Sequence, residues 1–200
     1  LDHPIFNLAF DPSGRLWAIT GGGPLLQLDP ATGAVVAAFG EGLTLGLAVE
    51  PATGMIYVGS NAGVERFDPE TGTFTRFSRD RDLRVGSLAF DEDGVLWAVV
   101  WPDRTEVVRF NERARAETLL EFDTEIDSIA FGQVGTRLNG LLFISHNTGD
   151  RANTGGMEPD NSEMTMVDLA TLRRVAIAGG GSRGDSLITM PAKKAPSANE

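Results

Sequence analysis

The chain has no cysteine, and only two histidines and one tyrosine occur among its 200 residues. The absence of cysteine excludes disulfides, thiolate metal sites and cysteine nucleophiles. Lysine is almost absent too, since Lys193 and Lys194 are the only two among 17 basic residues, and the net charge is −11. Nucleic acids and anionic membranes are bound through clustered positive charge. We therefore expect no nucleic-acid partner, and an acidic surface of this kind favours cation binding.

Long hydrophobic runs are also absent. No segment approaches the roughly 20 apolar residues that a membrane-spanning helix needs, so we expect no membrane span. The first residues, LDHPIF, have neither the basic nor the apolar segment of a secretory signal peptide. We accordingly expect no targeting signal in this chain.

A repeat with a period near forty residues organises the chain. Its clearest copy is the segment Gly86–Trp101, GSLAFDEDGVLWAVVW, in which two apolar runs flank an Asp/Gly turn. This pattern is typical of a β-hairpin. The apolar runs that start the four copies begin at Leu8, Leu47, Leu88 and Ile129, which lie 39, 41 and 41 residues apart. A fixed period of this size indicates a repeat architecture.

Each period divides into four short strands, and no helical periodicity lies between them. Four-stranded units of about forty residues are the blades of β-propellers. We predict an all-β protein, a β-propeller or propeller fragment with four four-stranded blades and the first strand of a fifth. The predicted segments are blades at 5–41, 42–82, 83–125 and 126–181, a partial fifth blade at 183–190, and a flexible polar tail at 191–200.

Two sets of residues are predicted to serve the scaffold. Aspartates that open the turns, such as Asp11, Asp29, Asp68 and Asp91, are expected to accept local hydrogen bonds within those turns. Aromatic residues recur at equivalent positions of the repeats, and we expect them to fill the interfaces between blades. They are Phe10, Trp17, Phe39, Tyr57, Phe67, Phe90, Trp97, Phe110, Phe131 and Phe143.

Four blades and one strand are an unusual count for a closed ring. Three explanations stay open at this point: the chain is part of a longer protein, two copies complete one ring by self-association, or the ring is small and distorted. We favour the first two.

The strand pair LAFDPSGRLWAIT…LLQLDPATG resembles the streptogramin lyase-like and NHL-repeat β-propellers of bacteria. The resemblance covers residues 5–122 and, more loosely, 126–182, and it implies a propeller without specifying its chemistry. Streptogramin lyases use a His/Glu constellation and a divalent metal, but neither His3 nor His146 lies in a matching motif, so no catalytic residue is carried over. The segment 153–185 resembles propeller segments of large bacterial surface or secreted proteins. That resemblance implies an extracellular or periplasmic location rather than a cytoplasmic one.

Ligands of propellers usually bind at the end formed by the inter-blade loops and the loops between second and third strands, because loops on a rigid scaffold vary freely. We predict that this end carries a ligand or partner face, with a protein or a glycan as the expected ligand. We expect the residues of this face to lie in loops, and they are Trp101, Asp103, Asp123, Glu125 and Asp127.

The longest insertion, residues 147–162, separates the second and third predicted strands of the fourth blade. Loops of this length are usually functional or disordered. Its side-chain oxygens suit Ca²⁺ or another divalent cation, because calcium takes six to eight oxygen ligands. The candidate metal ligands are Asp150, Asn153, Glu158, Asp160, Asn161 and Glu163. Their spacing matches no EF-hand, and a solvated loop or a partner contact remain the alternatives.

His146 is predicted to end the strand before this insertion, and it is the one candidate catalytic base. A base needs a partner within hydrogen-bond reach, which Asp127 or Asp150 would supply. The alternative is a structural histidine. The sequence favours a non-catalytic binding module of a bacterial envelope or secreted protein. The competing hypothesis is a metal-dependent lyase or lactonase with its site at the mouth of the propeller channel.

Overall fold

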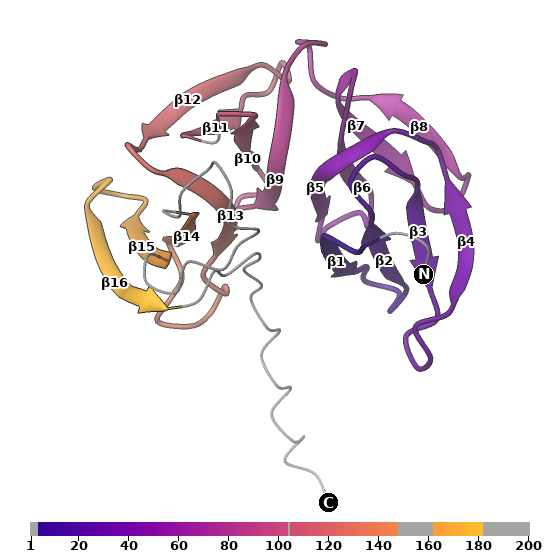
Figure 1. Ribbon diagram of the computed structural model, residues 1–200, viewed down its shortest axis with the longest axis horizontal. Coiled ribbons are helices and arrows are strands. Elements are labelled where there is room, and N and C mark those ends of the chain that lie inside the picture. The colour runs from indigo at the N-terminus through magenta and orange to yellow at the C-terminus, as the bar shows by residue number, and fades with distance from the viewer. Residues whose placement is uncertain (1–3, 104, 148–161, 182–200) are drawn as a thin grey trace, which may run out of the picture.

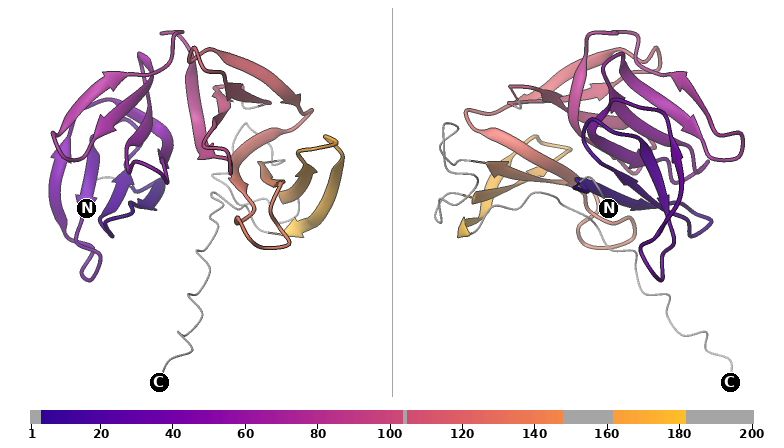
Figure 2. Two further views of the ribbon diagram at one scale, coloured as in Figure 1. Left: turned by 180° about the vertical axis from the view of Figure 1, so that it is seen from behind. Right: turned by 45° about the vertical axis from the view of Figure 1, so that its right-hand side comes forward.

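The computed structural model describes residues 4–103, 105–147 and 162–181. These residues form sixteen strands in four separate antiparallel sheets of four strands each, and they contain no helix. The four sheets follow one another around an arc, with the first and the fourth at its two ends (Figures 1 and 2). The predicted all-β architecture of four propeller blades is therefore confirmed. The predicted strand of a fifth blade, 183–190, and the tail, 191–200, lie outside the described residues.

Within each blade the strands follow chain order, and the first strand lies on the inner side of the arc (Figure 1). Blade 1 consists of β1 (Asn7–Phe10), β2 (Leu16–Ile19), β3 (Leu25–Leu28) and β4 (Val35–Phe39). Blade 2 consists of β5 (Leu43–Val49), β6 (Ile56–Ser60), β7 (Gly63–Asp68) and β8 (Thr73–Arg76). Blade 3 consists of β9 (Arg84–Phe90), β10 (Leu96–Trp101), β11 (Glu106–Phe110) and β12 (Ala116–Glu121). Blade 4 consists of β13 (Glu125–Phe131), β14 (Leu141–Asn147), β15 (Ser162–Asp168) and β16 (Arg174–Gly181).

The turns between third and fourth strands are closed by aspartate side chains in blades 1, 2 and 4, as predicted, and by Asn111 in blade 3. Asp29 Oδ1 accepts hydrogen bonds from the backbone N–H groups of Ala31 and Thr32 at 2.9 and 2.8 Å. Asp168 Oδ1 accepts the equivalent pair in blade 4. A short carboxylate that satisfies two turn N–H groups stabilises the reversal of the chain, which explains why the same chemistry recurs in the repeats.

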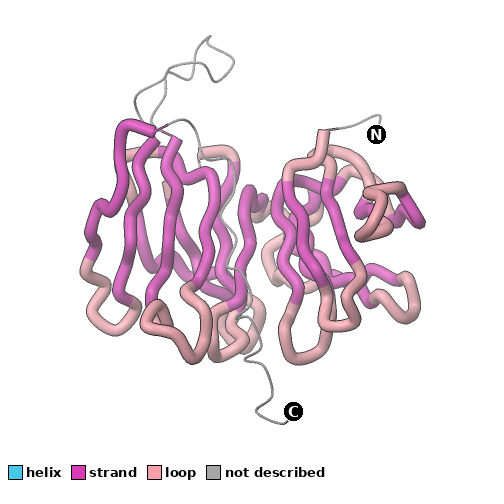
Figure 3. Tube along the Cα trace, turned by 90° about the horizontal axis from the view of Figure 1, so that it is seen from below, coloured by secondary structure: helices cyan, strands magenta, loops and turns pink. Residues whose placement is uncertain are grey.

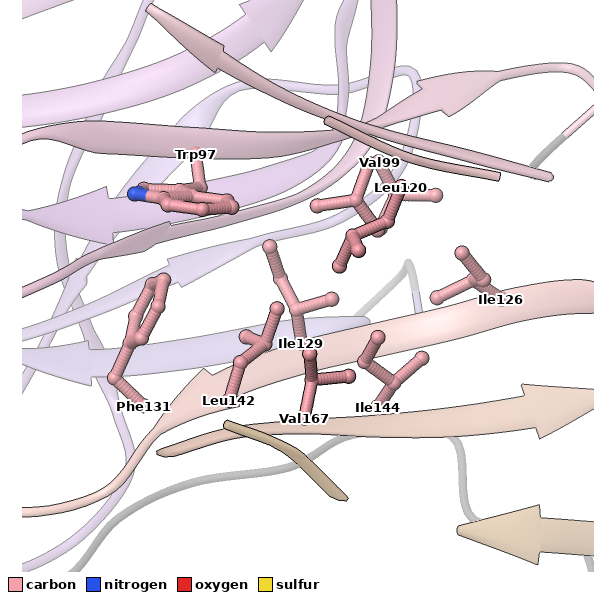
Figure 4. Close-up of a cluster of buried hydrophobic side chains, with 10 residues drawn as sticks. Trp97, Val99, Leu120, Ile126, Ile129, Phe131, Leu142, Ile144 and Val167 are labelled. Atoms are coloured by element: carbon pink, nitrogen blue, oxygen red, sulfur yellow. The ribbon is translucent and has the colours of Figure 1, made fainter. Parts of the chain in front are cut away.

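A hydrophobic core lies at each of the three interfaces between successive blades. Trp97, Val99 and Leu120 of blade 3 face Phe131, Leu142 and Ile144 of blade 4 across one of them (Figure 4). All six side chains are buried, and burying one such side chain contributes roughly 1.5–3 kcal/mol. Because a single blade exposes both of its faces, these interfaces are where most of the stability of the fold arises.

An aromatic pair recurs at two of these interfaces. The ring of Tyr57 on β6 lies 5.1 Å from Phe90 on β9, with an interplanar angle of 78°. Trp97 on β10 lies 5.5 Å from Phe131 on β13 at 68°. In both pairs the second strand of one blade meets the first strand of the next in an edge-to-face arrangement, which aromatic rings prefer. The predicted packing role of these residues is confirmed.

Two of the predicted interface aromatics do not pack between described blades. One is Phe143, which is half-buried on the face of blade 4 opposite to the core with blade 3, so its predicted interface role is wrong for the described chain. The other is Phe10. It occupies the position of Phe90 and Phe131 in the repeat, yet 59% of its surface is exposed. The prediction of a packed Phe10 is therefore wrong for the described chain. The physical reason is that β1 begins the first blade, so no described blade lies against the face on which Phe10 projects.

The described residues include no helix that is long and apolar enough to cross a lipid bilayer.

Candidate functional site

The predicted ligand face lies at the end of the molecule where the first strand of each blade begins and the second strand ends. We call this end of blades 3 and 4 the loop end, and it is the upper end in Figure 3. It is formed by the start of β9, the end of β10, the connection from β12 to β13, and the end of β14. The tight turns between first and second strands lie at the opposite end, so the two sets of connections are separated by the full height of the blades.

Trp101 is the last residue of β10 and is half-buried at the loop end. Its partner across the sheet is Arg84, the first residue of β9, which is exposed. Asp103 and Asp123 are both exposed, in the β10–β11 and β12–β13 connections. Arg84 was not among the residues predicted for this face, although its position at the start of a repeat, where the inter-blade loop ends, was the available signal.

Glu125 and Asp127 lie in a strand rather than in a loop, which corrects the prediction. The predicted strand began at Ser128, but β13 starts three residues earlier. Ile126 explains the difference, because it is buried in the core between blades 3 and 4 and draws its neighbours into the sheet. Glu125 pairs with Asn147 of β14 at the very end of this sheet.

Asp127 occupies a bulge in β13. The pairing passes from Ile126 opposite His146 to Ser128 opposite Ser145, so Asp127 is the additional residue between them. Its Oδ2 atom is withdrawn from solvent. Two residues before the apolar run of the repeat, where blade 4 has Asp127, blades 2 and 3 have Leu45 and Gly86. Blade 3 has the same bulge at Gly86, because its pairing passes from Val85 opposite Val100 to Ser87 opposite Val99. The bulge therefore belongs to the repeat, and blade 4 differs in having a carboxylate at this position of its innermost strand.

His146 is buried within β14, one residue before the end of that strand, and both of its ring nitrogens are engaged. Nδ1 is hydrogen-bonded to the Thr124 hydroxyl and Nε2 to the Thr165 hydroxyl, each at 2.9 Å. The ring also packs against Phe122, with centroids 5.0 Å apart. This geometry suits a structural histidine, which was the alternative to a catalytic base, because neither nitrogen is open to a substrate.

Burial lowers the pKa of the His146 imidazole below its ordinary value. The carboxylate of Glu163 acts to raise that pKa, and the charge of Arg174 acts to lower it further. The net effect keeps the ring neutral in the folded protein at neutral pH. A neutral ring held between two hydroxyls ties the β12–β13 connection to β14 and β15.

A cation–π contact secures the same connection from outside. The Arg174 guanidinium lies 4.3 Å from the centre of the Phe122 ring, and its Nη1 donates a hydrogen bond to the Glu121 carbonyl at 2.7 Å. Such contacts at exposed sites contribute about 0.5–1 kcal/mol. Asp123 therefore extends from a connection that is held on both sides, by His146 and by Arg174.

Most of the predicted metal ligands, namely Asp150, Asn153, Glu158, Asp160 and Asn161, lie outside the described residues. Glu163 is described, and it lies in β15 opposite His146 rather than in the insertion, with its side chain exposed. Over residues 4–103, 105–147 and 162–181, no group of three or more His, Asp or Glu side chains is placed to hold a metal ion.

No family model matches the chain, and no curated protein matches its sequence. Solved structures do match its fold. An auxiliary nutrient binding protein from Bacteroides thetaiotaomicron aligns with a TM-score of 0.64 and 14% identity, over 90% of this chain and 43% of that chain. Hydrazine synthase from Kuenenia stuttgartiensis gives 0.61 and 14%, over 92% and 51%. A gluconolactonase from Xanthomonas campestris gives 0.57 and 16%, over 70% and 53%.

These likenesses show the fold alone, since all three identities are low. They establish that the four sheets are arranged as the blades of a β-propeller. The chain spans about half the length of the solved propeller proteins that it matches.

Proposed function

We propose that the chain is a non-catalytic, ligand-binding propeller module, and that the loop end of blades 3 and 4 binds a glycan. The observation that carries the proposal is the position of Asp127. Where the regular repeats have Leu45 and Gly86, blade 4 has a partly withdrawn carboxylate at a bulge of its innermost strand. A repeat protein keeps its scaffold positions alike, so a polar departure at an inner position indicates a role in binding.

Other side chains at the loop end have the chemistry that carbohydrates require. Carboxylates such as Glu125 and Asp127 accept hydrogen bonds from sugar hydroxyls, and an indole such as that of Trp101 stacks on the apolar face of a sugar ring. Binding sites commonly combine aromatic walls with a few placed polar groups. The fold-level likeness to two solved nutrient binding proteins, from Bacteroides thetaiotaomicron and Bacteroides ovatus, supports a binding role.

A calorimetric titration tests this proposal. The probes are soluble oligosaccharides of glucose, xylose and N-acetylglucosamine, added to the unmodified chain, to Asp127→Asn and to Asp93→Asn. Asp93 is the matched control, because it is an exposed aspartate in a turn at the opposite end of blade 3. We expect Asp127→Asn to weaken the binding of one probe at least tenfold, which is about 1.4 kcal/mol, and Asp93→Asn to bind normally. Equal affinities for all three proteins would contradict the site.

The alternative function is a metal-dependent lactonase or lyase at the mouth of the channel. The fold-level likeness to a gluconolactonase and the inner carboxylate of Asp127 favour it as the second candidate. Glucono-δ-lactone offered with Ca²⁺ or Zn²⁺ separates the two proposals. Turnover that EDTA abolishes and that Asp127→Asn lowers would favour the enzyme, and the binding proposal expects no turnover above the uncatalysed rate.

Three further parts of the proposal rest on the sequence. The motifs support a streptogramin lyase-like or NHL-type affiliation, and with it a bacterial envelope or secreted location, extracellular or periplasmic.

The oxygen-rich insertion, residues 147–162, supports bound Ca²⁺. A protein that binds Ca²⁺ gains stability as RT ln(1 + [Ca²⁺]/Kd), so millimolar Ca²⁺ should raise the Tm and EDTA should lower it. A Tm that neither reagent changes would contradict the proposed Ca²⁺ binding.

A further inference from the structure

The outward face of blade 1 has the composition of an inter-blade interface without being covered by one. Leu8 on β1 is 43% exposed, whereas the equivalent residues of the other blades, Leu47, Leu88 and Ile129, are 3%, 4% and 3% exposed. Phe10 on the same face of β1 is also exposed, at 59%. Beneath them, Ala18, Leu26 and Leu28 form a small buried cluster. The described chain therefore repeats the apolar pattern of an interface at a position where it supplies no second blade.

Blade 4 presents the complementary face at the other end of the arc. Cross-strand pairing aligns Ala130, Phe143, Met166 and Val175 in one row, on the face opposite to the one packed on blade 3. Phe143 occupies the second-strand position that holds Trp17, Tyr57 and Trp97 in the other blades. Those three are buried, whereas Phe143 and Met166 are half-buried and Val175 is exposed.

We propose that a second copy of this chain covers both faces, and that Phe10 packs against Phe143 of the partner subunit. The two aromatic pairs already present define the contact. Tyr57 with Phe90 and Trp97 with Phe131 each join the second strand of one blade to the first strand of the next. Phe143 and Phe10 are the members of this series whose partners the described chain does not supply.

Two copies arranged in this way close one ring of eight blades, within the four to eight that propellers contain. The contact is head to tail, and a two-fold axis uses each free face once, so association stops at the dimer. Two solved neighbours agree with this count, since 92% of this chain spans 51% of the hydrazine synthase chain, and 94% of it spans 52% of the Bacteroides ovatus nutrient binding protein. Two copies therefore supply about as much chain as one such propeller.

Crosslinking tests the specific contact. The chain contains no cysteine, so Phe10→Cys in one preparation and Phe143→Cys in another give single reactive sites. We expect a short bis-maleimide to join the mixed preparations into a product of twice the chain mass. Val134→Cys replaces Phe10→Cys in the control mixture, since Val134 is 62% exposed in the turn between β13 and β14. No mixed product, or equal product in both mixtures, overturns the proposal.

Sedimentation equilibrium tests the association without introduced thiols. The unmodified chain should have twice the mass of one chain, and Leu8→Glu should sediment as a single chain with an unchanged β-sheet circular dichroism spectrum. Val134→Glu is the control and should remain a dimer. Added salt should favour the dimer, because each copy carries a net charge of −11 and salt screens the repulsion. A monomer at every concentration, or an open series of larger species, contradicts the two-fold ring.

Discussion

The indole N–H of Trp97 donates a hydrogen bond to Asp91 Oδ2 at 2.8 Å. Trp17 donates the same bond to Asp11 at 3.0 Å, across the same spacing of six residues. In each hairpin the aspartate that closes the turn also satisfies the indole of the packed tryptophan. The turn and the inter-blade core are therefore one structural unit, which explains why the Asp, Gly and Trp positions of these two repeats occur together.

Replacement of Asp91 by alanine should lower the free energy of unfolding by about 2 kcal/mol. The change removes the acceptor of the Trp97 indole and of the Val95 backbone N–H, which lies 2.8 Å from Asp91 Oδ1, and an unsatisfied buried donor costs about 1–3 kcal/mol. Urea denaturation measures the loss. Asp93→Ala in the same turn removes an exposed side chain and should stay within about 0.5 kcal/mol of the unmodified protein. Equal losses in the free energy of unfolding for the two variants would show that the indole hydrogen bond does not stabilise the fold.

Replacement of Leu172 by glycine should raise the stability. Leu172 has a φ of 56°, at the turn position where blades 1 and 2 have Gly33 and Gly72. A non-glycine residue in this left-handed region costs about 1–2 kcal/mol, and Leu172 is 45% exposed, so little packing is lost. We expect a gain of about 1 kcal/mol by urea denaturation. Gly33→Ala is the reciprocal control and should lose a similar amount, whereas a destabilised Leu172→Gly would contradict the strain.

The stability of the protein should fall as the pH decreases below about 6.5, the ordinary pKa of histidine. Burial lowers the pKa of His146 in the folded state, so the unfolded chain binds the proton first and protonation favours unfolding. His146→Gln should be less stable at pH 7.5 and should show a flatter pH dependence between 7.5 and 5. Urea denaturation of both proteins in a His3→Gln background measures this. Parallel pH profiles would show that His146 does not titrate in this way.

Asp11 should add a second loss of stability at lower pH. Burial acts to raise the pKa of its carboxyl, but hydrogen bonds from Trp17 and Arg15 and the charge of Arg15 outweigh burial and lower it. A carboxylate with a lowered pKa stabilises the fold above its unfolded pKa, about 3.9, and this contribution is lost as the pH falls through the folded value. Asp11→Asn should therefore show a shallower decline of stability between pH 5 and 2.5 than the unmodified protein.

The sequence predicted the blades well because its signals are local. Turn aspartates, turn glycines and alternating apolar residues act within a single hairpin, and the forty-residue period then implies how hairpins stack. The position of Phe10 could not be predicted in this way, since its exposure depends on whether another blade lies beside β1. The environment of His146 was equally out of reach, because Thr124 and Thr165 approach it from 22 and 19 residues away.

Part of the candidate site could be predicted because, like the blades, it follows from local signals of the repeat. Trp101, Asp103 and Asp123 follow from their places at strand ends, which the repeat defines. The bulge at Asp127 did not follow, because a shift of pairing depends on the partner strand β14 and on the burial of Ile126. A residue that differs from the repeat, such as Asp127, can be recognised in the sequence as a functional candidate. How its side chain is positioned depends on the pairing with the neighbouring strand.

The indole N–H signals of the three tryptophans provide the most direct test of the proposed binding end. Trp17 and Trp97 are buried and hydrogen-bonded to aspartates, whereas Trp101 lies half-buried at the loop end. In a ¹⁵N-correlation spectrum titrated with the oligosaccharide that binds in calorimetry, we expect the Trp101 signal to shift with the binding isotherm and the other two signals to stay fixed. Binding that leaves the Trp101 signal in place would contradict the proposed binding end.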